Sequence, residues 1–259
     1  MPGCFLFYLV YNCIIEIELC LPILQDGGVM EKQFIDADRT DKKINLAQFG
    51  EINHPIKIGA VDLNPSCKSN VLRMLIRKFP GNLLLPDELK WVLPLIEMAD
   101  LYQKNICAHP FLYLTIRHNN QKFEKLNEWH VDGFSMKIDH LPEQNYIWCN
   151  ASPTEYILQK FNIDNDFDPL SHNIHKFLSN RVSSPPKTIG VNEVWMVDPY
   201  VLHKAPDVMA ENRVFVRASF VPIEIQDANN TQNPLLPQKY TYDGVADFRD
   251  QLTDYDAKM

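Results

Sequence analysis

Short runs of alternating, strand-favouring residues recur between residues 111 and 221 of this chain, and they restrict it to a fold built mainly from β-strands. The runs cover residues 111–118, 146–150, 193–197 and 213–221, and β-branched and aromatic side chains are frequent in them. Side chains of a strand point alternately to the two faces of a sheet, so each run can bury at least one face. Residues 162–184 form a long polar stretch, in which we expect a lid or a variable loop.

Helices are expected beside these strands. In residues 69–79 the apolar side chains fall on one helical face, with Arg and Lys on the other. Residues 86–102 start with a proline and two acidic residues, which suit the first turn of a helix. Residues 153–156 are expected to open another short helix, and residues 44–63 to form two short strands with a turn. The predicted fold class is therefore α+β, mainly β with flanking helices.

One structural domain is expected. The chain has 259 residues, of which 46% are hydrophobic, enough for one substantial core. Within it we expect an extension at residues 1–29, supporting helices and strands at 30–105, the catalytic core at 106–222 and a peripheral segment at 223–259. The extension is either a native strand or sequence that precedes a true start at Met30.

The apolar stretch at residues 4–24 bears on location. It contains Glu16 and Glu18 and has no Lys or Arg before it. A signal peptide has a basic start, and each carboxylate in a membrane span costs about 2.5–3.5 kcal/mol. None of the six cysteines forms a CxxC pair, which favours a reducing compartment. We expect a cytoplasmic protein without a membrane partner, with an anchor or a signal as the alternatives.

The net charge narrows the choice of substrate. A formal charge of −8 disfavours a surface that binds many nucleic-acid phosphates, because that affinity comes from Lys and Arg. No peptide-reading or nucleic-acid-reading motif stands out. We therefore expect a small-molecule substrate, with nucleic acid and protein kept open, and the sequence sets no oligomeric state.

Two histidines and an aspartate carry the chemistry. His130 and Asp132 are two apart, so in a strand they share a face while Val131 points away into the core. Gly133 lets the backbone turn directly afterwards. With His203, they provide two imidazoles and one carboxylate, the facial triad of non-haem Fe(II) oxygenases, which leaves ligand positions open. A structural zinc site would have four ligands. The other histidines have no comparable setting: His54, His109, His118, His140, His172 and His175.

Two arginines follow the distal histidine in strand-like sequence. Arg213 and Arg217 are four residues apart and so lie on the same face of a strand. A buried guanidinium is permanently charged and needs an anionic partner, which a carboxylate can provide through two parallel hydrogen bonds.

The pattern of His130-x-Asp132, His203 and then Arg213 resembles the iron(II)- and 2-oxoglutarate-dependent dioxygenases. The resemblance covers residues 105–222 and implies a double-stranded β-helix, or jelly roll, for the core. It implies Fe(II) on the two histidines and the aspartate, with 2-oxoglutarate as cosubstrate and O2 as oxidant. The implied reaction hydroxylates or otherwise oxidises a substrate and releases succinate and CO2.

The resemblance also implies roles for polar residues around the metal. Arg213 would hold the far carboxylate of 2-oxoglutarate, and Arg217 resembles a second arginine of the taurine dioxygenase branch that meets substrate or cosubstrate. Arg217-Ala218-Ser219 matches an Arg-x-Ser string of many members, but Arg213 is favoured. Asn150 is a candidate for cosubstrate contacts and Arg117 for substrate contacts.

Two other classes are kept as alternatives. A cupin-type jelly-roll metal enzyme would use the same triad without 2-oxoglutarate, and Arg213 would then pair with a protein carboxylate. A catalytically silent jelly-roll binding module would keep the residues without the activity. Binding of 2-oxoglutarate separates the first alternative from the dioxygenase, and binding of metal separates the second.

Overall fold

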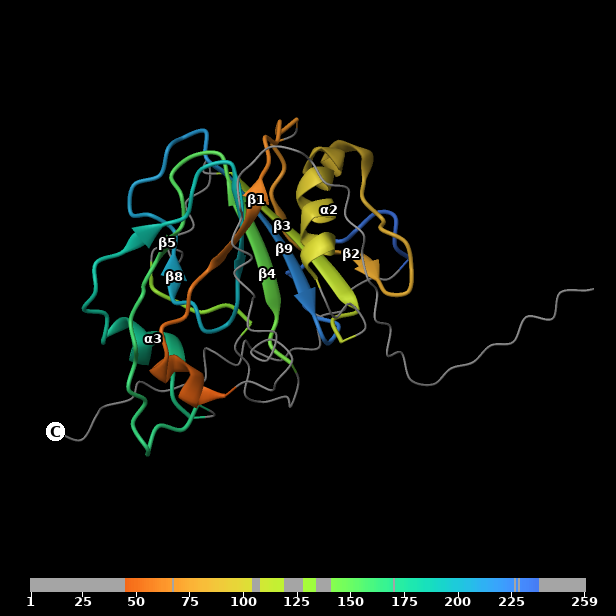
Figure 1. Ribbon diagram of the computed structural model, residues 1–259. Coiled ribbons are helices and arrows are strands. Elements are labelled where there is room, and N and C mark those ends of the chain that lie inside the picture. The colour runs from red at the N-terminus through yellow and green to blue at the C-terminus, as the bar shows by residue number, and fades with distance from the viewer. Residues whose placement is uncertain are drawn as a thin grey trace, which may run out of the picture. The chain divides into compact units, whose positions relative to one another are not determined.

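The structure is a computed structural model and describes residues 45–66, 68–103, 108–118, 128–133, 141–169, 171–225, 227 and 229–237. This part of the chain is mainly antiparallel β-sheet with few helices (Figure 1), so the mainly β, α+β class predicted from the sequence is confirmed. The expected extension at residues 1–29, with its apolar stretch, lies outside the described residues. So does much of the expected peripheral segment at 223–259.

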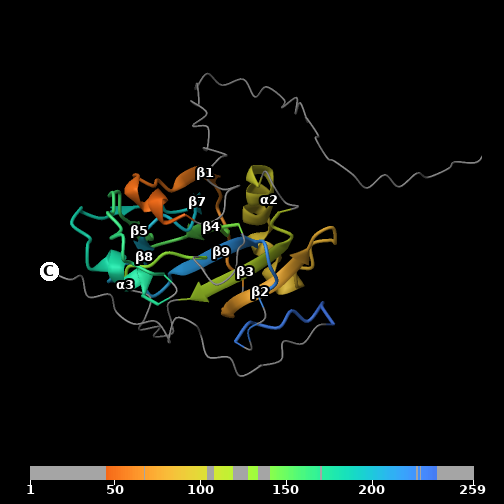
Figure 2. The same cartoon turned by 90° about the horizontal axis from the view of Figure 1, so that it is seen from below.

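A six-stranded sheet forms the larger part of the fold, and all its neighbouring strands are antiparallel. In spatial order the strands are β1 (Ile56–Ala60), β7 (Glu193–Val197), β4 (Gln144–Cys149), β9 (Val214–Val221), β3 (Phe111–His118) and β2 (Val71–Lys78). Figure 2 shows β4, β9, β3 and β2 side by side in this order. The strands expected from the alternating runs are therefore confirmed as β3, β4, β7 and β9.

A second sheet has three short strands, β6 (Lys187–Thr188), β5 (Glu155–Tyr156) and β8 (His203–Lys204). An isolated antiparallel bridge between His130 and His203 extends it by one more segment. After β3, the segment of His130 belongs to the small sheet, β4 to the large sheet, and β5 and β6 to the small sheet. Then β7 belongs to the large sheet, β8 to the small sheet and β9 to the large sheet. Consecutive segments therefore build both sheets together.

Two of the expected helices are strands instead. Residues 69–79 contain β2, which pairs with β3 through two register irregularities. Its apolar run serves both faces, since Met74 packs in the main core and Leu75 in a separate cluster. Apolar side chains on both faces fit a strand as well as a helix, and pairing with β3 decides between them. Residues 153–156 contain the strand β5, which pairs with β6 and β8. Both partners are distant in sequence, so the local pattern could not reveal this pairing.

The helical prediction for residues 86–102 is confirmed, as a 3-10 helix η2 (Asp87–Val92) followed by α2 (Leu93–Tyr102). Residues 44–63 form one strand, β1, and a 3-10 helix η1 (Leu46–Gly50) instead of two strands. The expected loop at 162–184 contains a short helix, α3 (Ile174–Ser179). Among the described residues, no helix has the length and apolar character needed to cross a membrane.

The main core lies between α2 and the large sheet (Figure 1). Leu112, Leu114 and Ile116 of β3 point to this side, as do Val214 and Val216 of β9. The alternate residues of the same strands point the other way. On that side an apolar cluster joins β4, β7 and β9 to Tyr156 of the small sheet. The region between the two sheets therefore has its own lining, separate from the core under α2.

Truncation of Leu114 tests the core under α2. Leu114 is fully buried in β3, so Leu114→Ala should leave a cavity and lower the free energy of unfolding by about 2–5 kcal/mol. Leu101 on α2 is 84% exposed, so Leu101→Ala should change it by at most about 0.5 kcal/mol. Urea unfolding followed by circular dichroism measures both values, and equal effects would contradict this placement of the core.

Candidate metal centre

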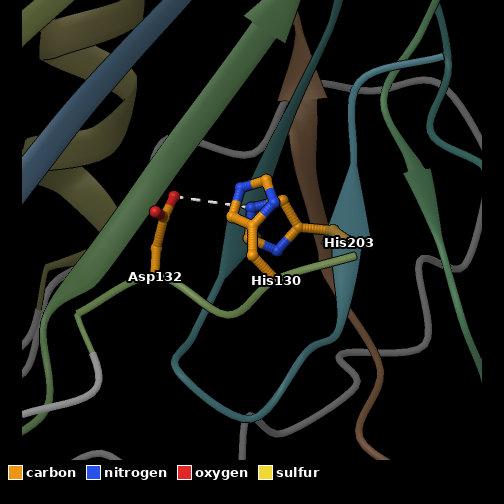
Figure 3. Close-up of side chains that lie close together, drawn as sticks. All are labelled: His130, Asp132 and His203. Carbon is orange, nitrogen blue, oxygen red and sulfur yellow. Dashed lines mark ion pairs between the residues drawn. The ribbon is translucent and has the colours of Figure 1, made fainter. Parts of the chain in front are cut away.

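The structure brings His130, Asp132 and His203 together. Their ligand atoms all lie within 4.8 Å of one another, and Figure 3 shows the three side chains grouped at one point. The two imidazole rings are 4.6 Å apart between centroids, and Nε2 of His203 lies 3.4 Å from Oδ2 of Asp132. Among the described residues, this is the group of three or more His, Cys, Asp or Glu side chains that could hold a metal ion.

A backbone bridge fixes the distance between the two histidines. The N–H of His130 donates to the carbonyl of His203, and the N–H of His203 donates to the carbonyl of His130, both at 2.9 Å. Residues opposite each other in an antiparallel pair are held at a set separation by such reciprocal bonds. The short strand β8 and the segment around His130 thus carry both imidazoles to the same place.

Hydrogen bonds also determine which ring nitrogens face the centre. Nδ1 of His130 lies 2.8 Å from the carbonyl oxygen of Glu128, and Nδ1 of His203 lies 2.9 Å from that of Val201. A carbonyl oxygen only accepts, so Nδ1 is the donor in each ring and Nε2 is the nitrogen left to bind a metal. Both histidines therefore offer Nε2 as a ligand, with orientation set by a backbone partner.

The electrostatics suit metal binding. The pKa of His130 is lowered to about 4, first by burial and then by the neighbouring His203. Burial acts to raise the pKa of Asp132, but Arg217 and His203 outweigh it and hold that pKa well below its usual range. At neutral pH His130 is thus a neutral imidazole and Asp132 a carboxylate, the forms in which these side chains bind metals.

Gly133 and Val131 take the places expected from the sequence. Gly133 has φ +68°, and a Cβ there would lie 2.6 Å from the Glu143 side chain, so only glycine fits directly after Asp132. Val131 is buried in a cluster with Phe177 and Leu178. The expectation that Val131 points into the core is confirmed, and His130 and Asp132 on either side of it lie together with His203.

His175 supports the backbone between two of the donors. The N–H of Val131 donates to Nδ1 of His175 at 3.2 Å. His175 lies on α3, which Asn173 caps by accepting from the N–H of Lys176. The sequence offered no setting for this histidine, because the contact joins segments that only the fold brings together. The segment expected as a lid thus supplies, through α3, a support for the His-x-Asp backbone.

Arg217 lies directly beside the centre. It projects from the face of β9 opposite the α2 core, and its Nη1 donates to Oδ2 of Asp132. Glu143 also acts on it electrostatically. Arg217 therefore holds one carboxylate oxygen of Asp132 and leaves the other oxygen to different partners.

Arg213 is buried in a different environment. The residue is 6% exposed. Its Nε donates to the carbonyl of Ser152 at 2.8 Å, and its guanidinium lies 5.4 Å from the centroid of the Phe215 ring. Burial lowers its pKa, and the Cys149 thiol is the group that opposes this. No carboxylate of the described residues forms an ion pair with it. Arg213 is thus a buried cation without a described carboxylate partner.

The other sequence candidates are Asn150, which directly follows β4, and Arg117, which lies on β3; both strands neighbour β9. Asn150 Oδ1 accepts from the N–H of Val214 at 2.6 Å, and its Nδ2 donates to the carbonyl of Asn212 at 3.0 Å. These bonds hold the residues on both sides of Arg213. Arg117 is half-buried on β3, and its pKa is lowered to about 10 by burial first and by Arg217 next.

Asn145 was not anticipated. It is fully buried on β4, opposite Ser219 of β9, and the Ser219 hydroxyl donates to its Oδ1. Its Nδ2 has no hydrogen-bond partner among the described residues. The sequence carried one signal for it, a polar residue at an inward position of a strand. Asn145 lies on the same face of β4 as Ile147, which is opposite Arg217 of β9.

The sequence matches no protein-family profile, and it matches no curated protein. Among solved structures the chain is similar to the crystal structure of EvdMO1, with 14% sequence identity and a TM-score of 0.28. The similarity covers 49% of this chain and 33% of the EvdMO1 chain, so the match spans about a third of that protein's length.

Substitution of His175 tests its support of the centre. His175→Ala removes the acceptor for the N–H of Val131, so the affinity for cobalt(II) should fall by about tenfold while the protein stays folded. Competition with a chromophoric chelator measures the affinity, and circular dichroism reports the fold. His175→Gln keeps an acceptor and should restore most of the affinity.

His172→Ala is the matched control for this experiment. Nδ1 of His172 accepts from the N–H of Asp168 in its own loop, whereas Nδ1 of His175 accepts from Val131. Its substitution should leave the cobalt affinity unchanged within about twofold. An equal loss in both alanine variants would show a general effect on α3 instead of a support of Val131.

Proposed function

We propose that this chain is an Fe(II)- and 2-oxoglutarate-dependent dioxygenase that oxidises a small-molecule substrate, by hydroxylation or a related reaction, and releases succinate and CO2. The observation that carries the proposal is the meeting of His130, Asp132 and His203, whose ligand atoms lie within 4.8 Å of one another. Two imidazoles and one carboxylate form the donor set of non-haem Fe(II) oxygenases.

The strand order supports a jelly-roll, double-stranded β-helix core for this enzyme. The four central segments of the large sheet run β7, β4, β9 and β3, and the small sheet runs β6, β5, β8 and then the segment of His130. Apart from β5 and β6, which both lie in the small sheet, segments consecutive in sequence alternate between two four-membered layers, as two coiling hairpins would place them. The donors then lie on the small sheet, facing the polar side of β9.

The donor set fits a ferrous ion. Nε2 of His130, Nε2 of His203 and one oxygen of Asp132 would hold it, since Nδ1 of both rings is committed to backbone carbonyls. Three protein donors on one side leave positions for a chelating cosubstrate and for oxygen. Bound there, iron would supply the oxygen activation that couples decarboxylation of 2-oxoglutarate to oxidation of the substrate.

Arg213 is the residue that we assign to the far carboxylate of 2-oxoglutarate. Arg213 is buried and forms no ion pair with a described carboxylate, so its guanidinium can bind a carboxylate of the cosubstrate. Asn150 positions this arginine, because its side chain binds the backbone of Asn212 and Val214 on either side. Arg217 instead orients Asp132, which it already contacts.

One apolar cluster has members that contact both His203 and Arg213. Val201, whose carbonyl holds His203, packs in one cluster with Ile147, and Phe215 packs against the same cluster below the Arg213 guanidinium. A dry lining strengthens the electrostatic contacts of a charged cosubstrate and protects reactive species from side reactions. In the cupin-type alternative Arg213 would pair with a protein carboxylate, and the described residues offer none.

Anaerobic binding tests the proposal. Fe(II) and 2-oxoglutarate added to the protein without O2 should produce a visible metal-to-ligand charge-transfer band. His203→Ala removes a metal donor, so the band should vanish. Arg213→Ala should raise the 2-oxoglutarate concentration for half-saturation by about 10- to 150-fold, since a hydrogen bond to a charged group is worth about 1.5–3 kcal/mol.

Arg77→Ala provides the matched control, because Arg77 lies on the α2 side of the large sheet and pairs with Asp100. It should leave half-saturation by 2-oxoglutarate unchanged. Absence of a band from wild-type protein that has bound iron would favour the cupin-type enzyme. Absence of metal binding would favour the silent binding module.

A further inference from the structure

Two buried hydrogen-bond donors are neighbours on the face of the large sheet that points away from α2. Asn145 of β4 lies opposite Ser219 of β9, and Arg217 is two residues before Ser219 on the same face of β9. Diagonal neighbours on adjacent antiparallel strands lie about 7–8 Å apart, within reach of long side chains. The amide of Asn145 and the guanidinium of Arg217 therefore lie close together, and Arg217 contacts the metal donor Asp132.

Each of the two residues has one donor left over. The Ser219 hydroxyl donates to Oδ1 of Asn145, and Nη1 of Arg217 donates to Oδ2 of Asp132. Nδ2 of Asn145 and Nε of Arg217 are buried, and neither has a hydrogen-bond partner among the residues that the structure describes. A buried donor without an acceptor costs free energy, so both N–H groups favour a ligand that brings an acceptor.

The local charges favour a neutral acceptor. The amide of Asn145 is uncharged, and the ion pair with Asp132 offsets the positive charge of Arg217. A carbonyl, ether or hydroxyl oxygen has lone pairs for both donors and brings no charge that would need a counterion. The side chains of Arg217 and Asp132 are 14% and 20% exposed, so a ligand can reach the centre beside which the donors lie.

Asn145 lies beyond Arg217 as seen from Arg213. Arg213 comes four residues before Arg217 and six before Ser219, so roughly 20 Å of extended strand separates it from the level of Asn145. Arg217, between these levels, contacts the metal donor Asp132. Under the proposed function Arg213 holds the far carboxylate of 2-oxoglutarate. A cosubstrate that extends from Arg213 to the metal therefore leaves the side of Asn145 to the primary substrate.

We propose that Asn145 and Arg217 bind a neutral acceptor oxygen of the primary substrate, a carbonyl, ether or hydroxyl oxygen, through Nδ2 and Nε. The assignment to the primary substrate rests on the proposed function, whereas the pair of donors does not. Asn145 thereby contributes to specificity, because a substrate without an oxygen at this place leaves both buried donors unpaired. The hydrogen bond from Ser219 orients the amide for this contact.

The first arm of the test observes the amide of Asn145 directly. Full-length protein with isotope-labelled asparagine side chains is studied by NMR, metal-free and, separately, saturated with 2-oxoglutarate and Zn(II), a diamagnetic stand-in for Fe(II). The probes are cyclopentanone, which has an acceptor oxygen, and cyclopentene, which has none. Cyclopentanone should shift an Asn145 amide proton downfield in both states, and cyclopentene should not. Absence of a shift with cyclopentanone, or equal shifts with both probes, overturns the proposal.

The second arm removes the donor of Asn145. Ser219→Ala removes the hydroxyl that donates to Oδ1 and keeps Nδ2, and the double variant Asn145→Leu/Ser219→Ala removes the amide as well. The double variant should bind cyclopentanone about fivefold more weakly than Ser219→Ala, because it lacks one more hydrogen bond. Both should bind cyclopentene equally. Saturation-transfer NMR on the probe measures the affinities, and equal affinities for cyclopentanone contradict the proposal.

Tyr146→Phe is the matched control for the double variant. The Tyr146 hydroxyl is also buried without a hydrogen-bond partner among the described residues, but Tyr146 packs in the core under α2, on the opposite face of β4. Its loss should change neither the affinity for cyclopentanone nor half-saturation by 2-oxoglutarate. An equal loss of cyclopentanone affinity in Tyr146→Phe would show a general effect on β4 and overturn the role of Asn145.

The same spectra separate the primary substrate from other partners of the amide. If 2-oxoglutarate alone shifts the Asn145 proton, and half-saturation by 2-oxoglutarate rises in the double variant, Asn145 binds the cosubstrate and the proposal is overturned. If the proton already lies downfield in ligand-free protein and neither probe moves it, an acceptor elsewhere in the chain holds it. That outcome overturns the proposal too.

The two proposals fail in different ways. If wild-type protein gives no charge-transfer band but cyclopentanone shifts the Asn145 proton in metal-free protein, the dioxygenase proposal fails and the donor site stands. If the band forms and cyclopentanone leaves the Asn145 proton unmoved, the dioxygenase proposal stands and the donor site fails. NMR of the metal-free protein thus distinguishes the outcomes without any measurement of turnover.

Discussion

The position of β9 between β3 and β4 is the constraint on which the rest of the structure depends. Its backbone groups are paired on both sides, so its side chains alternate strictly between two environments. Val216 and Ala218 enter the core under α2, whereas Arg217 and Ser219 face the other way. A single strand thereby contributes to the apolar core on one face and to a charged interior on the other.

The candidate metal centre depends on backbone contacts before it depends on side chains. Reciprocal hydrogen bonds join His130 to His203, and carbonyl groups hold Nδ1 of both rings. Val131 is anchored from the opposite side by burial and by His175. Preorganisation of this kind keeps Nε2 of both histidines aimed at one point, so little ordering is left for metal binding to impose.

Some features were predictable because they are local. The alternation in residues 111–118 and 213–221 predicts strands, and the i, i+2 spacing of His130 and Asp132 predicts a shared face. Residues 69–79 were wrongly predicted as a helix, since an apolar run suits either structure until a partner strand is known. Arg213 and Arg217 could be placed on one face and Arg213 favoured for the cosubstrate, but the contact between Arg217 and Asp132 could not be predicted, because it joins distant segments.

The sequence by itself determined the kinds of donor, their order along the chain and most strands of the large sheet, since alternation and turn-forming residues act over a few positions. The tertiary structure alone decided that His203 meets His130, that His175 supports Val131 and that Arg117 shares a charged region with Arg213 and Arg217. Those relations depend on strand pairing between distant segments and on burial. Burial strengthens electrostatic interactions, and it exists only once the sheets have formed.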